Sequence, residues 1–436
     1  MPAYTEITEK HIGSLSLESR KALGQYMTPA SIGDVMADML DLDPASSPDV
    51  LDPACGTGEL LLAVQRACPN AHLFGFDIDE GMVDAARENV PDSNIRLLSI
   101  FDEASVAEHG KYDYVIGNPP YFEMKKDDPD LASSAIEGFA ALSDKGRLNI
   151  YSLFVEYAMR LVRVGGKVSF LVPPSMNNGA FFKELRRRVL ELGVVRQIRL
   201  VRENDSFEDA LTSVQILLLE RTDDGYEKNL KASSAYVHDT GSTIIFTDRK
   251  DVIEKFAKGR ASIGSQGFSV KTGTVVWNKY KGDFAKGNIC SSGGVERTDG
   301  KQEKAPGSDM VPVLFAKDIS VDNKLVLSDK VSAPGHWLPD TAARVDKGPA
   351  IIVNRIVGSL DAPRLRFAYV DLDRFYGENH VNVITREDGD AVKMKQLFDI
   401  LSAIESSELS SYLQAVTGNT QLSATELGEM PVAKIS

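Results

Sequence analysis

Glycine-rich and acidic motifs follow two short apolar runs in the first half of the chain, and their residue types suit a small-molecule site. LDPACGTGELL spans residues 51–61, and GFDID spans residues 75–79. Gly56 and Gly58 let the backbone approach a ligand where a Cβ would collide. An acid about 20 residues further on, here Asp77, typically accepts hydrogen bonds from a ribose diol. The alternatives are an ordinary tight turn for the loop and a helix N-cap for Asp77.

The sequence NPPY at residues 118–121 offers a second kind of chemistry. Two consecutive prolines fix the backbone and remove two N–H donors, which leaves acceptors on display. The Asn118 side-chain oxygen and the Pro119 carbonyl form an acceptor pair that suits a planar group carrying an NH₂. The ring of Tyr121 would stack on the face of that group. For this motif alone, a strand-ending turn with a core tyrosine is the alternative.

Apolar runs that alternate with amphipathic stretches predict an α/β fold with a mostly parallel, doubly wound sheet. The last two strands have no helix between them, so we expect an antiparallel hairpin at one sheet edge. The long connection 123–149 is typical of functional loops. Strands are predicted at 49–54, 72–78, 95–100, 112–118, 167–173, 196–201 and 213–220, and helices near 30–41, 58–67, 80–89, 150–163 and 180–192.

The pattern changes after the run TDDGYEKN at residues 222–229. We therefore predict two domains, 1–225 and 226–436. The second has short β-like segments punctuated by glycine, and helical patterns near 391–404 and 407–416. It is predicted to be a β-rich α+β domain.

The composition is that of a folded protein, with 436 residues, 43% hydrophobic and 26% charged. No apolar stretch is long enough to cross a membrane, and the N-terminus lacks a signal-peptide pattern, so we expect a cytoplasmic protein without membrane contact. The three cysteines form no CxxC pair and the histidines show no metal-ligand spacing, so no metal site is predicted. The net charge of −14 lowers the odds of binding nucleic acid without excluding it.

The order and spacing of these motifs, with the Phe101-Asp102 step between them, resemble class I S-adenosylmethionine-dependent methyltransferases that modify exocyclic amines. GQYMTP at residues 24–29 adds a further feature of gamma-class adenine-N6 DNA methyltransferases of the restriction–modification type. Enzymes of that class carry a target-recognition domain at the C-terminus. The resemblance covers residues 20–220, and it makes the first domain the cofactor-binding catalytic domain and the second the DNA-specificity domain.

The resemblance implies a role for each matching residue. S-adenosyl-L-methionine is the implied cofactor, with Asp77 at its ribose, Ile78 and Phe101 at its adenine faces and Asp102 at its amino group. Asn118, Pro119, Tyr121 and Phe207 would hold a flipped target adenine. The full cofactor set is Tyr26, Thr28, Pro29, Asp52, Ala54, Gly56, Gly58, Asp77, Ile78, Phe101, Asp102, Asn118 and Pro120.

The implied reaction transfers a methyl group to the N6 amino group of adenine in double-stranded DNA. Positioning and electrostatic stabilisation supply the rate without a metal. Extruding the base costs a few kcal/mol, which stacking on Tyr121 and Phe207 would offset. We expect a monomer, with any cognate restriction endonuclease as a separate protein. Candidate base readers in the second domain are Arg297, Lys301, Lys304, Lys317, Arg344, Arg355, Arg364 and Arg366.

Two other kinds of function remain open at this point. One is methylation of another amine or amide, namely an rRNA guanine, a protein glutamine or the cytosine N4 group. The other is a non-catalytic DNA-binding subunit of a defence system. An intact NPPY speaks against the second, because a pure binder has no use for the acceptor array.

Overall fold

The computed structural model divides the chain into two compact units, Met1–Lys250 and Asp251–Ser436. It describes residues 3–14, 27–125, 127–144, 148–201, 214–241, 243–279, 310–326, 337–358, 363–416 and 421–435. Two of the sequence-predicted site residues, Tyr26 and Phe207, lie outside the described residues.

Unit 1 contains a seven-stranded sheet in the order β3-β2-β1-β4-β7-β9-β8. The strands are β1 (Asp49–Asp52), β2 (His72–Asp77), β3 (Asn94–Leu97), β4 (Tyr112–Gly117), β7 (Val162–Val172), β8 (Gly193–Val201) and β9 (Val214–Arg221). The first five pair in parallel, while β9 runs antiparallel to both β7 and β8. This is the mixed α/β sheet with an antiparallel pair that the sequence predicted.

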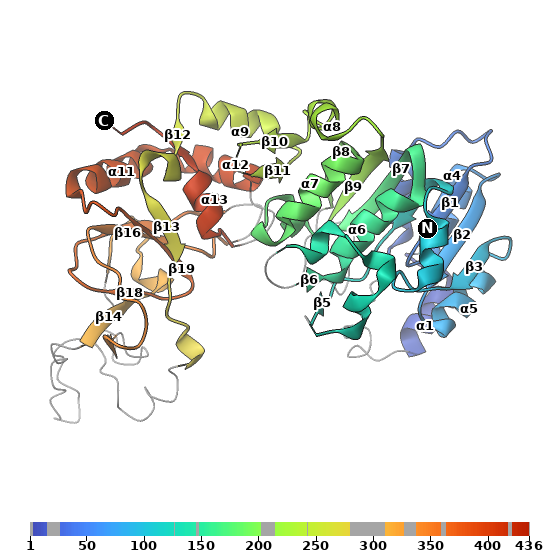
Figure 1. Ribbon diagram of the computed structural model, residues 1–436, viewed down its shortest axis with the longest axis horizontal. Coiled ribbons are helices and arrows are strands. Elements are labelled where there is room, and N and C mark those ends of the chain that lie inside the picture. Colours follow the sequence, from blue (N-terminus) through green and yellow to red (C-terminus); the bar gives the residue numbers. More distant parts are fainter. Residues whose placement is uncertain are drawn as a thin grey trace. The chain divides into compact units, whose positions relative to one another are not determined.

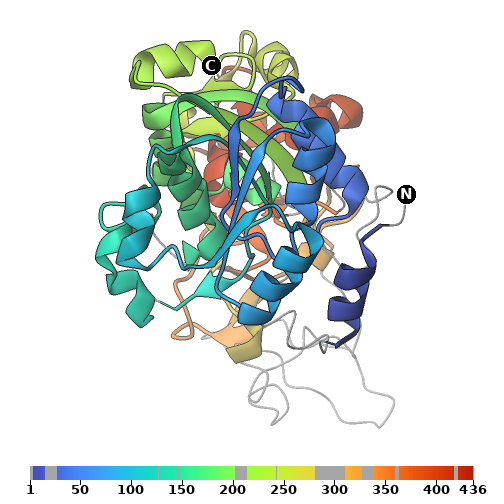
Figure 2. The ribbon, with the colours of Figure 1, turned by 90° about the vertical axis from the view of Figure 1, so that its right-hand side faces the viewer.

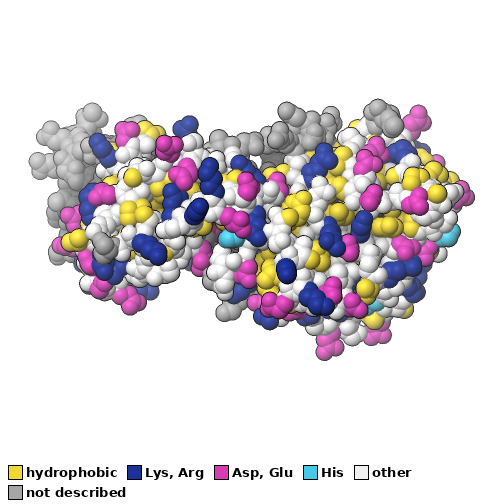
Figure 3. Space-filling view, turned by 90° about the horizontal axis from the view of Figure 1, so that it is seen from above, with side chains coloured by type: hydrophobic (Ala, Val, Ile, Leu, Met, Phe, Trp, Pro, Cys, Tyr) yellow, Lys and Arg dark blue, Asp and Glu magenta, His cyan; other side chains and the backbone are white. Residues whose placement is uncertain are grey.

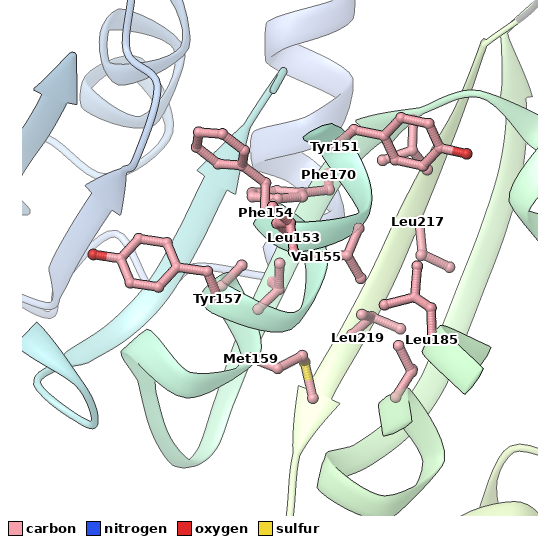
Figure 4. Close-up of a cluster of buried hydrophobic side chains, with 14 of the residues drawn as sticks. Tyr151, Leu153, Phe154, Val155, Tyr157, Met159, Phe170, Leu185, Leu217 and Leu219 are labelled. Carbon is pink, nitrogen blue, oxygen red and sulfur yellow. The ribbon is translucent and has the colours of Figure 1, made fainter. Parts of the chain in front are cut away.

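Helices cover both faces of this sheet, as the alternation of buried side chains along the strands requires. Leu51, Val115 and Phe170 belong to a core shared with α6 (Ile150–Leu161) and α7 (Lys183–Leu192). Figure 4 shows part of this core, in which every residue of α6 except Arg160 is buried.

The adjacent strand residues face the opposite way. Val50, Ile116 and Leu171 pack in a second core with α3 (Ala30–Leu40), α4 (Glu59–Ala67) and α5 (Glu80–Asn89). Figure 2 shows the two groups of helices on either side of the strands. With both faces covered, the loops at the carboxyl ends of the strands are left to form a site.

The boundary between the units lies after Lys250, later than the boundary predicted after residue 225. The intervening elements are α8 (Tyr226–Ala232), β10 (Val237–Asp239) and β11 (Ile244–Phe246), and Val237 and Phe246 are buried in the core of unit 1. Asn229 is fully buried, with Nδ2 donating to the Leu190 carbonyl at 2.9 Å. These contacts join residues 226–250, which the predicted division assigns to the second domain, to unit 1.

Unit 2 is built on a four-stranded sheet in the order β13-β19-β16-β17. Its strands are β13 (Ser269–Thr272), β16 (Ala350–Asn354), β17 (Phe367–Val370) and β19 (Val381–Thr385), all antiparallel to their neighbours. A second sheet contains β14 (Met310–Leu314), β15 (Trp337–Pro339) and β18 (Tyr376–Gly377), and β12 (Ala261–Ser262) pairs with β20 (Pro431–Val432).

The helices of unit 2 are α11 (Ala391–Ala403), α12 (Ser406–Val416) and α13 (Ala424–Glu429), and α9 (Lys250–Ala257) begins at the boundary between the units. The first two confirm the helical stretches expected from the sequence, whereas α9 and β17 were not predicted. The unit is β-rich with added helices, as expected. Within the described ranges, no helix is long and apolar enough to cross a membrane.

The boundary segment provides a first prediction. Asn229→Ala leaves the Leu190 carbonyl without its partner inside unit 1, so we expect the free energy of unfolding to fall by about 1–3 kcal/mol. Urea unfolding followed by circular dichroism measures the change. Lys228→Ala, an exposed neighbour on the same helix, is the control and should change stability little. Equal effects for the two variants would contradict the structural role given to Asn229.

Candidate functional site

A cavity of about 560 Å³ lies in unit 1 where the loops after β1, β2, β3 and β4 meet. Its lining includes seven of the sequence-predicted site residues: Ala54, Gly56, Asp77, Ile78, Phe101, Asn118 and Pro120. Four separate strand ends contribute these residues. The topology of the sheet therefore brings together motifs that are far apart in the chain.

The glycine-rich loop forms one wall of the cavity. Gly56 and Gly58 have φ values of +52° and +89°, which favour glycine, and Gly58 is the N-cap of α4. Gly56 lines the cavity, whereas a Cβ on Gly58 would come within 3.1 Å of Val90. The two glycines thus have different tasks: one keeps space open for a ligand, and the other permits close packing on α5.

The Asp77 carboxylate joins the loops after β1 and β2. One oxygen accepts the Gly56 N–H at 2.9 Å, and the other accepts the Asp79 N–H at 3.0 Å. The N-cap of α5 is Asp79, whose side chain accepts from the backbone of Gly81 and Met82. The helix-capping alternative for Asp77 is therefore wrong, and its carboxylate is left at the cavity wall.

A second carboxyl group, that of Asp52, is buried beside the cavity with 1% of its surface exposed. It accepts the Ala54 N–H at 3.0 Å. Burial raises its pKa to about 8, only partly countered by that hydrogen bond, and the nearby Asp77 adds to the rise. Burial also raises the pKa of Asp77. Two acids with raised pKa values at one site are suited to a ligand that carries positive charge and hydrogen-bond donors.

The Asn118 amide stands at the end of β4, facing the cavity. Its Nδ2 donates to Thr28 Oγ1 at 3.0 Å, and its Oδ1 accepts from the Tyr121 hydroxyl at 2.6 Å. The Tyr121 hydroxyl also lies 2.9 Å from the Leu171 carbonyl oxygen, and its ring packs edge-on against Tyr151. These hydrogen bonds orient the Asn118 amide at the end of β4.

Other sequence-predicted residues lie near the cavity without being part of its lining. Thr28 and Pro29 are buried, and Pro29 is the N-cap of α3. Asp102 accepts the Ser99 N–H at 2.9 Å and begins a short 3-10 turn (Glu103–Glu108). Asp52, Gly58, Pro119 and Tyr121 likewise do not belong to the lining of the cavity.

The connection between β4 and α6 closes another side of the cavity. It contains the short pair β5 (Glu123–Met124) and β6 (Leu148–Asn149) and three 3-10 turns at Pro129–Ala132, Ser134–Ile136 and Ala140–Leu142. Phe122, Met124, Asp128 and Asp130 from this segment line the cavity. The sequence predicted a functional loop here but not which residues it contributes.

The N-terminal segment is a further contributor that the motifs did not reveal. Helix α1 (Glu6–Ser14) places the fully buried Thr8 hydroxyl 2.8 Å from that of Thr57, which lies between the two loop glycines. Asn89 Nδ2 donates to the Thr57 carbonyl and to Thr8 Oγ1. Thr5 donates to the Glu59 carboxylate at 2.8 Å. Because Thr8 is far from the loop in sequence and of an ordinary residue type, no pattern could mark it.

The basic stretch 181–189 does not present a row of free cations. Arg186 is fully buried and donates to the carbonyls of Met176 and Gly179, while Arg187 and Arg188 form ion pairs with Glu191. Acidic and basic side chains intermingle across the face shown in Figure 3. No group of His, Cys, Asp and Glu among the described residues could hold a metal ion.

The chain is similar to known restriction–modification methylases. Residues 76–207 match the family of Eco57I restriction-modification methylases. The chain is 29% identical to Type II methyltransferase M.AccI of Acinetobacter calcoaceticus over 47% of its length and 38% of the relative. It is 23% identical to Modification methylase CviBIII of Paramecium bursaria Chlorella virus NC1A, over 62% of this chain and 64% of that one. It is also 23% identical to Type II methyltransferase M.BsuBI of Bacillus subtilis, over 95% and 88%.

S-adenosyl-L-methionine is the cofactor that the similarity to these methyltransferases implies. The chain is related to restriction–modification DNA methyltransferases, as its motifs predicted. The residues present fit this cofactor, because the Gly56 loop leaves room, Asp77 offers a carboxylate and buried Asp52 would be stabilised by a positive charge.

The Thr8 contact predicts an effect on cofactor binding. Thr8→Val removes the hydroxyl that holds Thr57, so we expect the Kd for S-adenosylmethionine, measured by calorimetry, to rise by about tenfold. Thr8→Ser keeps the hydroxyl and should restore the affinity. Wild-type affinity in the valine variant would show that α1 does not support the loop.

The raised pKa of Asp52 predicts a dependence of stability on pH. The pKa of Asp52 is about 8 in the folded protein and about 3.9 in the unfolded chain. The contribution of this carboxyl group to stability therefore falls as pH rises from about 4 and is lost above about 8. Asp52→Asn stays neutral, so the melting temperature of the variant minus that of wild type should grow between pH 5 and pH 8.5, without cofactor.

Scanning calorimetry of both proteins across this range measures that difference in melting temperature. Asp92→Asn, at an exposed position, is the control for the loss of one negative charge. A melting-temperature difference that is constant with pH would contradict the assignment of a neutral Asp52 carboxyl.

Proposed function

We propose that this protein is a site-specific DNA methyltransferase that transfers a methyl group from S-adenosylmethionine to the N6 amino group of a flipped-out adenine in double-stranded DNA. The single observation that carries the proposal is that Asn118 and Pro120 of NPPY line the same cavity as Gly56 and Asp77. A cofactor bound in this cavity would therefore lie next to a substrate amine that is held by Asn118 at the end of β4.

The bound cofactor supplies an activated methyl group. The task of the protein is to raise the nucleophilicity of an amino group whose lone pair is delocalised into the base. In the proposal, Asn118 Oδ1 and the Pro119 carbonyl accept the two hydrogens of that amine and draw the nitrogen toward tetrahedral geometry. Preorganised acceptors of this kind stabilise developing charge without reorganisation.

The contacts of Asn118 suit it to this role. Thr28 accepts a hydrogen bond from Nδ2, and the Tyr121 hydroxyl donates one to Oδ1. Together the two bonds fix the plane of the amide and distinguish its nitrogen from its oxygen. Oδ1 is the proposed acceptor for the target amine, since an amide oxygen can accept two hydrogen bonds. The excess proton passes to water after transfer, and no side chain with a tuned pKa is needed to take it.

The aromatic contacts offset the cost of base flipping in this proposal. Tyr121 follows the acceptor pair directly, and Phe207 is the second stacking residue implied by the family resemblance. Stacking contributes about 1–3 kcal/mol per base, against an extrusion cost of a few kcal/mol. The second unit would read the DNA sequence, and any restriction endonuclease would be a separate protein.

The direct test is methyl transfer from radiolabelled S-adenosylmethionine to unmethylated genomic DNA. Asn118→Ala should lower kcat by about 10²-fold or more, with the Kd for the cofactor nearly unchanged. Label on RNA or protein instead of DNA would contradict the proposed substrate.

Tyr121 gives a second prediction, since its ring and its hydroxyl are proposed to do different things. Tyr121→Phe removes the bond to Asn118 but keeps the ring, whereas Tyr121→Ala removes both. We expect the phenylalanine variant to keep most of its activity and the alanine variant to lose about tenfold or more in kcat/KM on DNA. Equal losses would assign the effect to the hydroxyl and contradict a stacking role.

A further inference from the structure

A second cavity, of about 860 Å³, lies wholly within unit 2, and we call it the α12 cavity. It is bounded by the loop before β17, the end of β16 and the first turns of α12. Its lining is Val321, Asn323, Asn354, Ile356, Val357, Gly358, Pro363, Arg364, Leu365, Arg366, Ser406, Ser407, Leu409 and Ser410.

The charge of this lining is unusual for the chain. The protein has 63 acidic and 49 basic residues, yet the described residues that line the α12 cavity include two arginines and no acid. Arg364 is exposed and makes no ion pair with another residue in the part of the chain that is described. Glu408, on the same helix as the serines, is paired with Arg260. The cavity therefore favours an anionic occupant.

Polar contacts hold the backbone of Arg364 and the guanidinium of Arg366. Asn354, 1% exposed, donates from Nδ2 to the carbonyls of Ile356 and Arg364. The Arg364 N–H donates to the Val357 carbonyl at 2.6 Å, and the Arg366 guanidinium reaches the Ile319 carbonyl at 3.4 Å. A fixed backbone under an exposed guanidinium is typical of a preorganised binding surface and not of a mobile surface residue.

The rest of the lining adds hydrogen-bond donors and exposed apolar groups. Ser406, Ser407 and Ser410 lie in the first turns of α12, whose buried face carries Leu409. Hydroxyls and a helix N-terminus complement arginine in binding phosphate. Val321 and Ile356 are 78% and 46% exposed at the same cavity. Phosphate-binding groups interleaved with apolar contacts match a chain of phosphates and deoxyribose rings better than an isolated anion.

We propose that the α12 cavity binds the sugar-phosphate backbone of one strand of duplex DNA. Arg364 and the serine hydroxyls bind phosphate oxygens, and Val321 and Ile356 contact the sugars. The inference rests on the proposed function, because it identifies part of the surface through which unit 2 would hold its DNA. It also separates the sequence-predicted basic candidates: Arg364 and Arg366 line this cavity, whereas Arg355 is bound to the Asn379 carbonyl and Lys317 lies over the Phe315 ring.

The test measures binding of the full-length protein to a fluorescein-labelled random-sequence duplex by anisotropy at several salt concentrations. Arg364→Ala should raise the Kd by about fivefold or more and reduce the slope of log K against log salt by about 1. The Kd for S-adenosylmethionine should not change. Arg374→Ala is the matched control, since it removes one positive charge from unit 2 at a residue that pairs with Asp340 and does not line the cavity.

Ser407→Glu is the second variant and guards against loss of folding. An acid in the first turn of α12 is expected to favour the helix, so the melting temperature should be kept or raised while DNA binding weakens. Wild-type DNA affinity in both variants would overturn the proposal. The same result with normal methyl transfer to DNA would overturn the cavity assignment and leave the proposed function standing. A wild-type protein that neither binds nor methylates DNA would overturn both.

Discussion

The site in unit 1 depends on two hydrogen bonds that the Asp77 carboxylate accepts. The carboxylate accepts N–H groups from Gly56 and from Asp79, and so ties the loop after β1 to the loop after β2. Without this carboxylate the Gly56 N–H would lose its hydrogen bond at the cavity wall. Gly56 has a left-handed backbone conformation, so its N–H takes no part in a β-ladder or a helix. The position of Asp77 follows from the parallel sheet, which delivers both loops to the same edge.

Asp52 and Asp77 are buried here, where ionisation of a carboxyl group is costly. Hydrogen bonds from backbone N–H groups offset only part of that cost. Burial raises the pKa values of both Asp52 and Asp77, and neither is paired with a basic side chain by an ion pair among the described residues. The arrangement is poor for the stability of the free protein and good for a ligand with positive charge. Such opposition between stability and binding is expected at functional sites.

The sequence was sufficient for the features that repeat or that need a special residue type. Strand and helix positions in unit 1 follow from apolar periodicity. Gly56 is recognisable because few other residues suit a left-handed loop, and Asp77 because it is an acid at the end of a predicted strand. The assignment of the N-cap to Asp79 instead of Asp77 required the geometry. So did the Thr8 contact with Thr57, because a threonine hydroxyl acting across many residues leaves no periodic trace. In unit 2, the strands are short and pair with strands that are distant in sequence, so apolar periodicity predicted neither β17 nor the α12 cavity.

The most direct measurement of the central claim is identification of the modified nucleoside. Genomic DNA from a methylation-deficient host is incubated with the protein and S-adenosylmethionine bearing a deuterated methyl group, digested to nucleosides and examined by mass spectrometry. The account predicts deuterated N6-methyldeoxyadenosine, absent with Asn118→Ala. Deuterated N4-methyldeoxycytidine, or no labelled deoxynucleoside at all, would contradict it.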